Sequence, residues 1–143
     1  MGRVTVGAKV ENAQDLWDVR QGRKTPDQVR SVDIPDALVD SGATTLGLPG
    51  SLIQQLGLAK SYEKRAKTAG GTVTVGIYDI VNLTIQGREC KVEVMELPEG
   101  SPALIGQIPL ELMDWVIDMP AQKLIGNPRH GGEQMFEVWT FWE

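Results

Sequence analysis

One short motif in this chain combines a carboxylate with a tight turn. The motif Asp40-Ser41-Gly42 follows the apolar run Ala37-Leu38-Val39, which predicts a strand that delivers the Asp40 side chain onto a glycine-containing turn. Two carboxylates that share one proton can activate a water molecule and donate a proton, because their like charges prevent both from ionising together. Asp-Ser-Gly occurs only once in the chain, so such a site would need a second copy of the same chain.

A second motif could support this turn from below. Leu104-Ile105-Gly106 lies downstream, directly behind Pro102-Ala103. Two bulky apolar side chains would fill the core beneath the turn, and the glycine would let two backbone segments approach closely. We therefore expect Leu104, Ile105 and Gly106 to brace the Asp40 turn.

The stretch between these two motifs predicts a hairpin. Ala69-Gly70-Gly71 is flanked by β-forming residues within Lys67–Val75, a pattern that is typical of a hairpin tip. A mobile hairpin with a glycine tip would be a suitable lid for an open peptide cleft.

Taken together, the three motifs resemble those of a known family. The segments A-L-V-D-S-G-A-T, A-G-G and A-L-I-G-Q are similar in order and spacing to motifs of the retropepsin-like aspartic proteases, specifically the single-domain bacterial members. The resemblance extends from about Ser31 to Asn127, with weaker agreement over Val4–Asn12. It implies an all-β fold, a closed or partly open β-barrel with one or two short helices. Residues 1–143 would form a single domain that is one half of a dimeric aspartic protease.

The resemblance also implies roles for individual residues. Asp40 of one copy would act as general base on water, and the protonated Asp40 of its partner would donate to the scissile carbonyl. Ser41 would brace the two catalytic loops across the dimer axis, the Gly42 backbone would hold the carboxylates coplanar, and Ala43 matches a small residue of the family. The flap tip, which would contact an extended peptide through its backbone, is formed by Ala69, Gly70, Gly71 and Thr72.

Other interpretations of the Asp40 motif stay open. Asp-Ser-Gly is a common turn sequence, because Asp side chains cap turns, and only the combination with the other motifs favours a protease. A serine nucleophile is disfavoured, since no Gly-x-Ser-x-Gly surrounds Ser41. The alternative function is a non-catalytic dimeric or peptide-binding module on the same fold. The retained Asp40 and the glycine hairpin favour the enzyme.

Composition narrows the possible classes. A chain of 143 residues with 41% hydrophobic residues can build one core. The net charge of −5 and the lack of a long basic run argue against nucleic acid as a partner. The longest apolar runs are too short to cross a bilayer, and the N-terminal residues do not resemble a signal peptide. Composition therefore predicts a cytoplasmic chain that binds neither nucleic acid nor membranes, and the resemblance to the protease family implies a homodimer that acts on peptide or protein substrates.

The chain contains one cysteine, Cys90, and one histidine, His130. A single cysteine excludes an intrachain disulfide, and one residue of each type does not favour a zinc site, so we expect neither a metal nor another cofactor. Cys90 shares its strand parity with Val92 and Val94 and is interpreted as a small core residue. His130 lies in a loop rich in glycine and is interpreted as a surface residue.

Other segments are predicted from their periodicity and turn residues. The expected strands are Val4–Val10, Ser31–Val39, three strands within Val73–Leu97 separated at Asn82 and at Gln86-Gly87, and Val116–Asp118 and Lys123–Ile125 around Pro120. The expected short helices are Pro49–Gly57, with Ser51 as its cap, and Pro109–Trp115.

Two further segments stand out by their composition, one charged and one apolar. Asp15–Arg30 is charged and is interpreted as a solvated excursion with a helical turn around Asp15–Val19. Met135–Trp142 is too apolar to extend alone into water. We expect it either to form part of a dimer interface or to pack on its own subunit.

Overall fold

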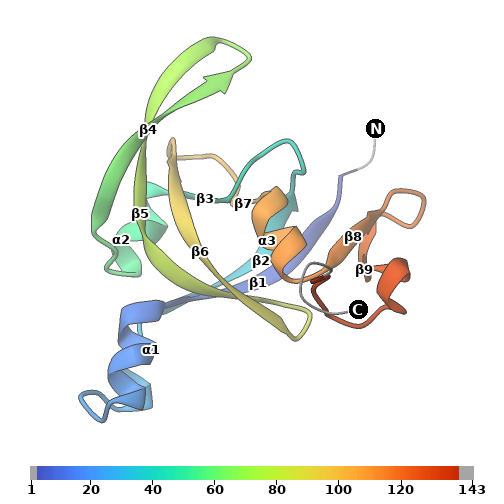
Figure 1. Cartoon of the computed structure of the whole chain (residues 1–143). Helices are drawn as coiled ribbons and strands as arrows, with labels where there is room; N and C mark the ends of the chain where they lie inside the picture. The colour runs from blue at the N-terminus through green and yellow to red at the C-terminus, as the bar shows by residue number, and fades with distance from the viewer. Residues whose placement is uncertain (1–2, 139–143) are drawn as a thin grey trace.

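The computed structural model describes residues 3–138 (Figure 1). In chain order its elements are β1 (Thr5–Asn12), α1 (Ala13–Arg20), η1 (Pro26–Gln28), β2 (Ser31–Val39), β3 (Leu46–Pro49), α2 (Gly50–Gln55), β4 (Lys60–Thr68), β5 (Gly71–Ile85), β6 (Arg88–Leu97), β7 (Leu104–Ile105), α3 (Gln107–Leu112), β8 (Trp115–Asp118), β9 (Lys123–Gly126) and η2 (Pro128–His130).

Seven of these strands form one mixed sheet that closes on itself. Their order is β1-β2-β7-β3-β6-β5-β4, and an additional pairing of β1 with β5 completes the ring. The pairs β2–β7 and β3–β6 are parallel, whereas the other pairs of the large sheet are antiparallel. The predicted all-β, barrel-like fold is therefore confirmed, although the described residues contain three short α-helices rather than one or two.

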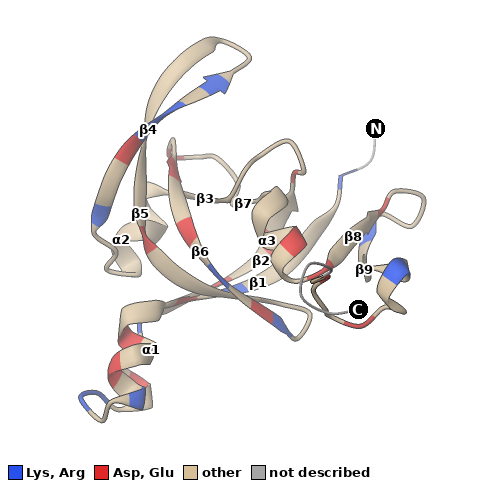
Figure 2. Cartoon of the chain, viewed as in Figure 1, with Lys and Arg blue, Asp and Glu red and all other residues tan. Residues whose placement is uncertain are grey.

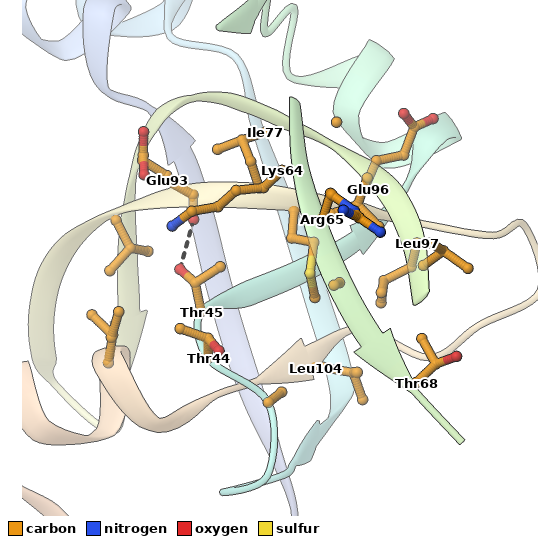
Figure 3. Close-up of a pocket in the computed structure, with 18 of the residues that line it drawn as sticks. Thr44, Thr45, Lys64, Arg65, Thr68, Ile77, Glu93, Glu96, Leu97 and Leu104 are labelled. Atoms are coloured by element: carbon orange, nitrogen blue, oxygen red, sulfur yellow. Dashed lines mark hydrogen bonds between the residues drawn. The ribbon is translucent and has the colours of Figure 1, made fainter. Parts of the chain in front are cut away.

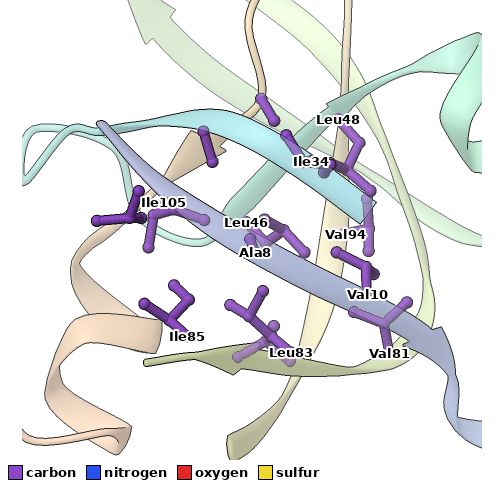
Figure 4. Close-up of a cluster of buried hydrophobic side chains, with 14 of the residues drawn as sticks. Ala8, Val10, Ile34, Leu46, Leu48, Val81, Leu83, Ile85, Val94 and Ile105 are labelled. Carbon is purple, nitrogen blue, oxygen red and sulfur yellow. The ribbon is translucent and has the colours of Figure 1, made fainter. Parts of the chain in front are cut away.

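The core lies inside the ring because the strands alternate apolar and polar residues. In β1 the alternate residues Val6, Ala8 and Val10 are buried, and they meet buried side chains from β3, β5 and β6 (Figure 4). Burying an aliphatic side chain fully contributes about 1.5–3 kcal/mol, whereas helices as short as α2 and α3 are marginal by themselves. The ring therefore provides most of the stability and fixes the positions of the connecting loops.

The stretch Val73–Leu97 forms two strands rather than the predicted three. β5 continues through Asn82, which is 2% exposed and pairs with Lys91 of β6. Its side-chain amide donates to Glu89 Oε1 at 2.7 Å and its carbonyl oxygen accepts from Lys91 Nζ at 3.1 Å. These partners satisfy a polar residue that would otherwise favour a turn. The real break is at Gln86-Gly87, where both φ angles are positive, 50° and 85°, as in a type I′ hairpin turn.

The excursion Asp15–Arg30 is less solvated than its composition predicts. α1 starts at Asn12, whose side chain accepts from the Asp15 N–H. The Asp15 carboxylate is fully buried and accepts hydrogen bonds from the Arg30 side chain, which hold its pKa well below the usual range, and from Lys24. A buried charge is tolerated when it is paired and hydrogen-bonded. In this segment, Arg30 and Lys24 provide the pairing for the buried Asp15 carboxylate.

The interpretation of His130 as a surface residue is wrong. Its side chain is 11% exposed, with Nδ1 at 2.6 Å from Asp114 Oδ2 and Nε2 at 2.8 Å from Glu137 Oε2. The hydrogen bonds with Asp114 and Glu137 raise the pKa of His130. Cys90, by contrast, packs against the core, and burial raises the pKa of its thiol to about 11.

Smaller differences concern the helices and the C-terminal segment. The N-cap of α2 is Pro49, and Ser51 caps nothing with its side chain; its N–H donates to Glu99 Oε1 at 2.7 Å. Strands β8 and β9 lie where they were predicted. Residues 135–138 are exposed and belong to no strand, and 139–142, the rest of the predicted apolar segment, lie outside the described residues. No helix within residues 3–138 is long and apolar enough to cross a membrane.

Candidate active site

Asp40 is the first residue after β2 and begins a loop, residues 40–45, that leads into β3; we call it the Asp40 loop. The Asp40 N–H donates to the Ile105 carbonyl at 2.9 Å, which continues the parallel pairing of β2 with β7. The Ala43 N–H donates to the Asp40 carbonyl at 3.0 Å, and the Gly42 N–H donates to Asp40 Oδ1 at 2.9 Å. The turn therefore holds both the backbone and the carboxylate of Asp40.

The segment Leu104-Ile105-Gly106 lies directly beneath this loop. Ile105 is fully buried, and the first two N–H groups of α3 donate to loop carbonyls, Gln107 to Ala43 at 2.8 Å and Ile108 to Thr44 at 2.9 Å. A Cβ atom on Gly106 would lie 2.4 Å from the Thr45 carbonyl oxygen. Only glycine fits this contact between two backbone segments, because neither side can yield by rotating a side chain.

The loop opens onto a cleft with a volume of about 1200 Å³. The β4–β5 hairpin forms one wall and the Asp40 loop with β6 forms the other (Figure 3). The residues that line the cleft are Asp40, Gly42–Thr45, Tyr62, Lys64–Thr68, Val73–Ile77, Ile80, Lys91–Glu93, Met95–Pro98, Leu104 and Ile108.

The structure brings some of the predicted site residues together and leaves others apart. Asp40, Gly42, Ala43 and Leu104 line the cleft, whereas Ser41 is exposed beside it. The hairpin tip is not part of the lining: Ala69, Gly70, Gly71 and Thr72 lie beyond Thr68 and Val73. In Figure 1 the hairpin extends past the rest of the ring. A single chain therefore does not place the predicted flap tip over Asp40.

Sequence reasoning missed the charged residues of both cleft walls. Lys64, Arg65 and Lys67 come from β4, and Lys91, Glu93 and Glu96 come from β6. The available signal was the charge-rich stretch Lys60–Thr68 in front of the hairpin tip, which Figure 2 shows with residues of both signs along β4. Strand alternation from that stretch would have predicted which of its charges face inward.

Tyrosine hydroxyls hold both of the β6 carboxylates that line the cleft. Tyr62 Oη donates to Glu93 Oε1 at 2.8 Å and Tyr78 Oη donates to Glu96 Oε1 at 3.1 Å. The hydrogen bond with Glu93 raises the pKa of Tyr62, so the hydroxyl stays protonated and able to donate. These carboxylates are thus occupied in local bonds, unlike the Asp40 carboxylate, which stands at the turn with a single backbone donor.

A family model of aspartyl proteases matches residues 28–108. This span is more than half of the chain, and it contains the Asp40 loop, the β4–β5 hairpin and the Leu104-Ile105-Gly106 segment. The chain belongs to the aspartyl protease family. A search of curated proteins found no significant match.

Membership of the aspartyl protease family, and of its retropepsin-like branch, gives the geometry a chemical meaning. A protease of this class uses carboxylates and water rather than a covalent nucleophile, and backbone hydrogen bonds to β7 hold the turn that carries the Asp40 carboxylate. Within residues 3–138, no group of three or more His, Cys, Asp and Glu side chains is arranged to hold a metal ion.

Proposed function

We propose that this chain hydrolyses internal peptide bonds as a homodimer in which each copy supplies one Asp40. The observation that carries the proposal is the position of Asp40, on a backbone-fixed turn at the edge of a peptide-sized cleft. The motif occurs once per chain, and the mechanism needs two carboxylates.

In this mechanism the two Asp40 carboxylates share one proton, since like charges at close range prevent both from ionising. The ionised Asp40 takes a proton from water as the water attacks the scissile carbonyl, and the protonated Asp40 donates to the carbonyl oxygen. The roles then exchange, so the titration belongs to the pair and not to either residue.

The surroundings of Asp40 are compatible with a partner copy. Ser41 and Gly42 are exposed in the single chain, so a second Asp40 loop has access to this face. We assign Ser41 to bracing the two loops and the backbone of Gly42 and Ala43 to contact with substrate. We assign the flap tip, Ala69 to Thr72, to covering the cleft that the dimer completes. The whole chain would act as one domain, in the cytoplasm, where a chain with one cysteine needs no oxidising environment.

The test is cleavage of a mixed peptide library between pH 4 and 7 by the purified chain. Asp40→Asn should lower turnover by about 100-fold or more, because it removes acid–base catalysis, while its melting temperature changes little. Asp36→Asn, an exposed residue of β2, is the matched control and should retain activity. Specific activity should rise with protein concentration and then plateau.

Two results would overturn the proposal. Turnover by Asp40→Asn comparable to that of the wild type would mean that another group does the chemistry. Full activity at concentrations where sedimentation detects only monomer would show that activity does not need a homodimer. If peptides bind but none is cleaved at any pH, the alternative of a non-catalytic dimeric or peptide-binding module takes its place.

A further inference from the structure

The inner face of the β4–β5 hairpin carries one charged residue in an otherwise apolar and aromatic surface. The strand register pairs Tyr62 with Ile77, Lys64 with Val75, and Ala66 with Val73. Residues opposite one another in an antiparallel pair, and residues two apart along a strand, lie on the same face. All six residues line the cleft, and Lys64 is the charged one among them; Arg65 and Lys67, which alternate to the other face of β4, also contribute to the lining.

The orientation of this face is fixed by Tyr62. Its hydroxyl donates to Glu93 Oε1 at 2.8 Å, so the face that carries Tyr62 is turned toward β6. Lys64 follows two residues later, and Figure 3 shows its side chain extending to the side of Thr45 and Glu93, while Arg65 extends from the opposite side of the same strand. Lys64 therefore points across the cleft toward the wall that carries the Asp40 loop.

Among the described residues, Lys64 has no ion pair and no side-chain hydrogen bond. Glu63, the acidic residue of the same strand, is already engaged, since it pairs with Lys60 Nζ at 3.1 Å. Across the cleft, Glu93 and Glu96 accept from Tyr62 and Tyr78. An ammonium that projects into a cleft with apolar neighbours is attracted more strongly to a carboxylate than it would be in bulk water.

We propose that Lys64 determines substrate specificity by binding an Asp or Glu side chain of the peptide under the hairpin. The inference rests on the proposed function, because it describes the substrate of that same cleft. The peptide carboxylate would accept a hydrogen bond from Lys64 Nζ, and the flanking residues of the peptide would cover Val73, Val75 and Ile77. The favoured substrates are therefore peptides with one acidic side chain near the scissile bond and apolar residues beside it.

The first experiment sequences the products that the wild-type chain releases from the mixed peptide library. The position with the strongest acidic enrichment is then synthesised in three forms, with Glu, Gln and Lys. We expect the Glu peptide to have a kcat/KM about fivefold above the Gln peptide, as for a solvent-accessible ion pair of good geometry. Lys64→Met should abolish this ratio, and Lys64→Glu should invert the preference so that the Lys peptide is cleaved fastest.

Lys123→Glu is the matched control, because it makes the same change in net charge on an exposed residue of β9 outside the cleft lining. It should leave the Glu-to-Gln ratio unchanged. Melting temperatures of all variants establish that each is folded, and Lys64→Gln provides a second neutral variant with a polar side chain.

A second experiment measures binding without catalysis. Fluorescence anisotropy with the Asp40→Asn chain uses labelled peptides of one apolar sequence that differ only in a central Glu or Gln, so it does not depend on cleavage. The Glu peptide should bind more tightly than the Gln peptide, and adding Lys64→Met should remove the difference. Cleavage without any acidic preference, or a preference that survives Lys64→Met, overturns the role of Lys64 and leaves the proposed function intact. No cleavage, but a Lys64-dependent binding preference, rejects the protease and supports the specificity. If the chain shows no cleavage and no preferential binding, both the proposed function and the role of Lys64 are rejected.

Discussion

The Asp40 loop and the β4–β5 hairpin face each other across one cleft but are held in different ways. Backbone hydrogen bonds tie the loop to β7 and α3, and Gly106 packs directly against its backbone. β4 pairs only with β5, and eight of its nine residues are exposed. Regions with few buried contacts open locally at low free-energy cost. We therefore expect one wall of the cleft to hold its position and the other to move.

The largest expected effect is on the rigid wall. Gly106→Ala should lower the free energy of unfolding by about 3 kcal/mol, at the upper end for overpacking, because the new Cβ meets backbone atoms that cannot rotate away. Thermal or urea unfolding measures the loss, and library cleavage should fall with it as the Asp40 loop shifts. If Gly106→Ala has the melting temperature and the activity of the wild type, the contact of Gly106 with the backbone of the Asp40 loop does not constrain the position of that loop.

A third kind of attachment differs from both walls, because the titratable side chains of Asp114 and His130 hold Met135 and Glu137. The hydrogen bonds with Asp114 and Glu137 raise the pKa of His130, so protonated His130 stabilises the folded chain. That contribution is fully present below the unfolded pKa of histidine and is lost as pH rises through the raised folded value. Arg88 lies beside this cluster and donates to the Met113 and Asp114 carbonyls.

The expected result is a wild-type melting temperature that falls as pH rises from about 6.5, the ordinary pKa of histidine, into the alkaline range. His130→Gln should show a flatter profile over the same window, and hydrogen exchange of the Asp40 loop should not follow His130. A wild-type profile that rises across this window would contradict the sign of the shift.

A smaller effect is expected on the mobile wall. Tyr62→Phe removes the bond from the hairpin base to Glu93, which contributes about 1 kcal/mol or less. Backbone hydrogen exchange in β4 should become faster, and KM should rise more than kcat falls. Ser61→Ala, its exposed neighbour, is the control and should leave both unchanged. If exchange in β4 is unaffected by Tyr62→Phe, other contacts fix the hairpin.

The smallest effect is expected at the hairpin tip. In Gly70→Ala the new Cβ would have its nearest neighbour, Thr68 Oγ1, at 3.9 Å, so stability should change by less than about 0.5 kcal/mol. The comparison with Gly106→Ala uses the same substitution on both walls. Similar losses at the two glycines in thermal unfolding would remove the distinction between a rigid and a mobile wall.

The parts of the site that were predictable depend on short segments. Three features could be inferred because each depends on a pattern of adjacent residues. They are the β-strand before Asp40, the glycine hairpin and the position of Leu104-Ile105-Gly106. Asn82 and His130 were misinterpreted because their partners, Glu89 and Asp114, come from other elements. Composition predicts a turn or a loop at such residues, and only the tertiary pairing shows that their polar groups are satisfied.

The cleft walls illustrate the same limit at larger scale. The sequence identifies Lys64 as a charged residue but not the direction of its side chain. That direction depends on the register of β4 against β5 and on the hydrogen bond from Tyr62 to Glu93. In the sequence, Asp15 is one of many charged residues in its segment, yet in the structure its side chain is fully buried. Burial of a charge is decided by partners such as Arg30, which local sequence does not identify.

The position of β4 at the end of the sheet order has a consequence for solubility. Its outer edge offers backbone donors and acceptors to any extended chain, and a free edge of this kind promotes aggregation. Five of its nine residues, Lys60, Glu63, Lys64, Arg65 and Lys67, are charged, and charges on an edge strand deter pairing between molecules. The charges of β4 therefore oppose edge-to-edge pairing of the hairpin with neighbouring molecules.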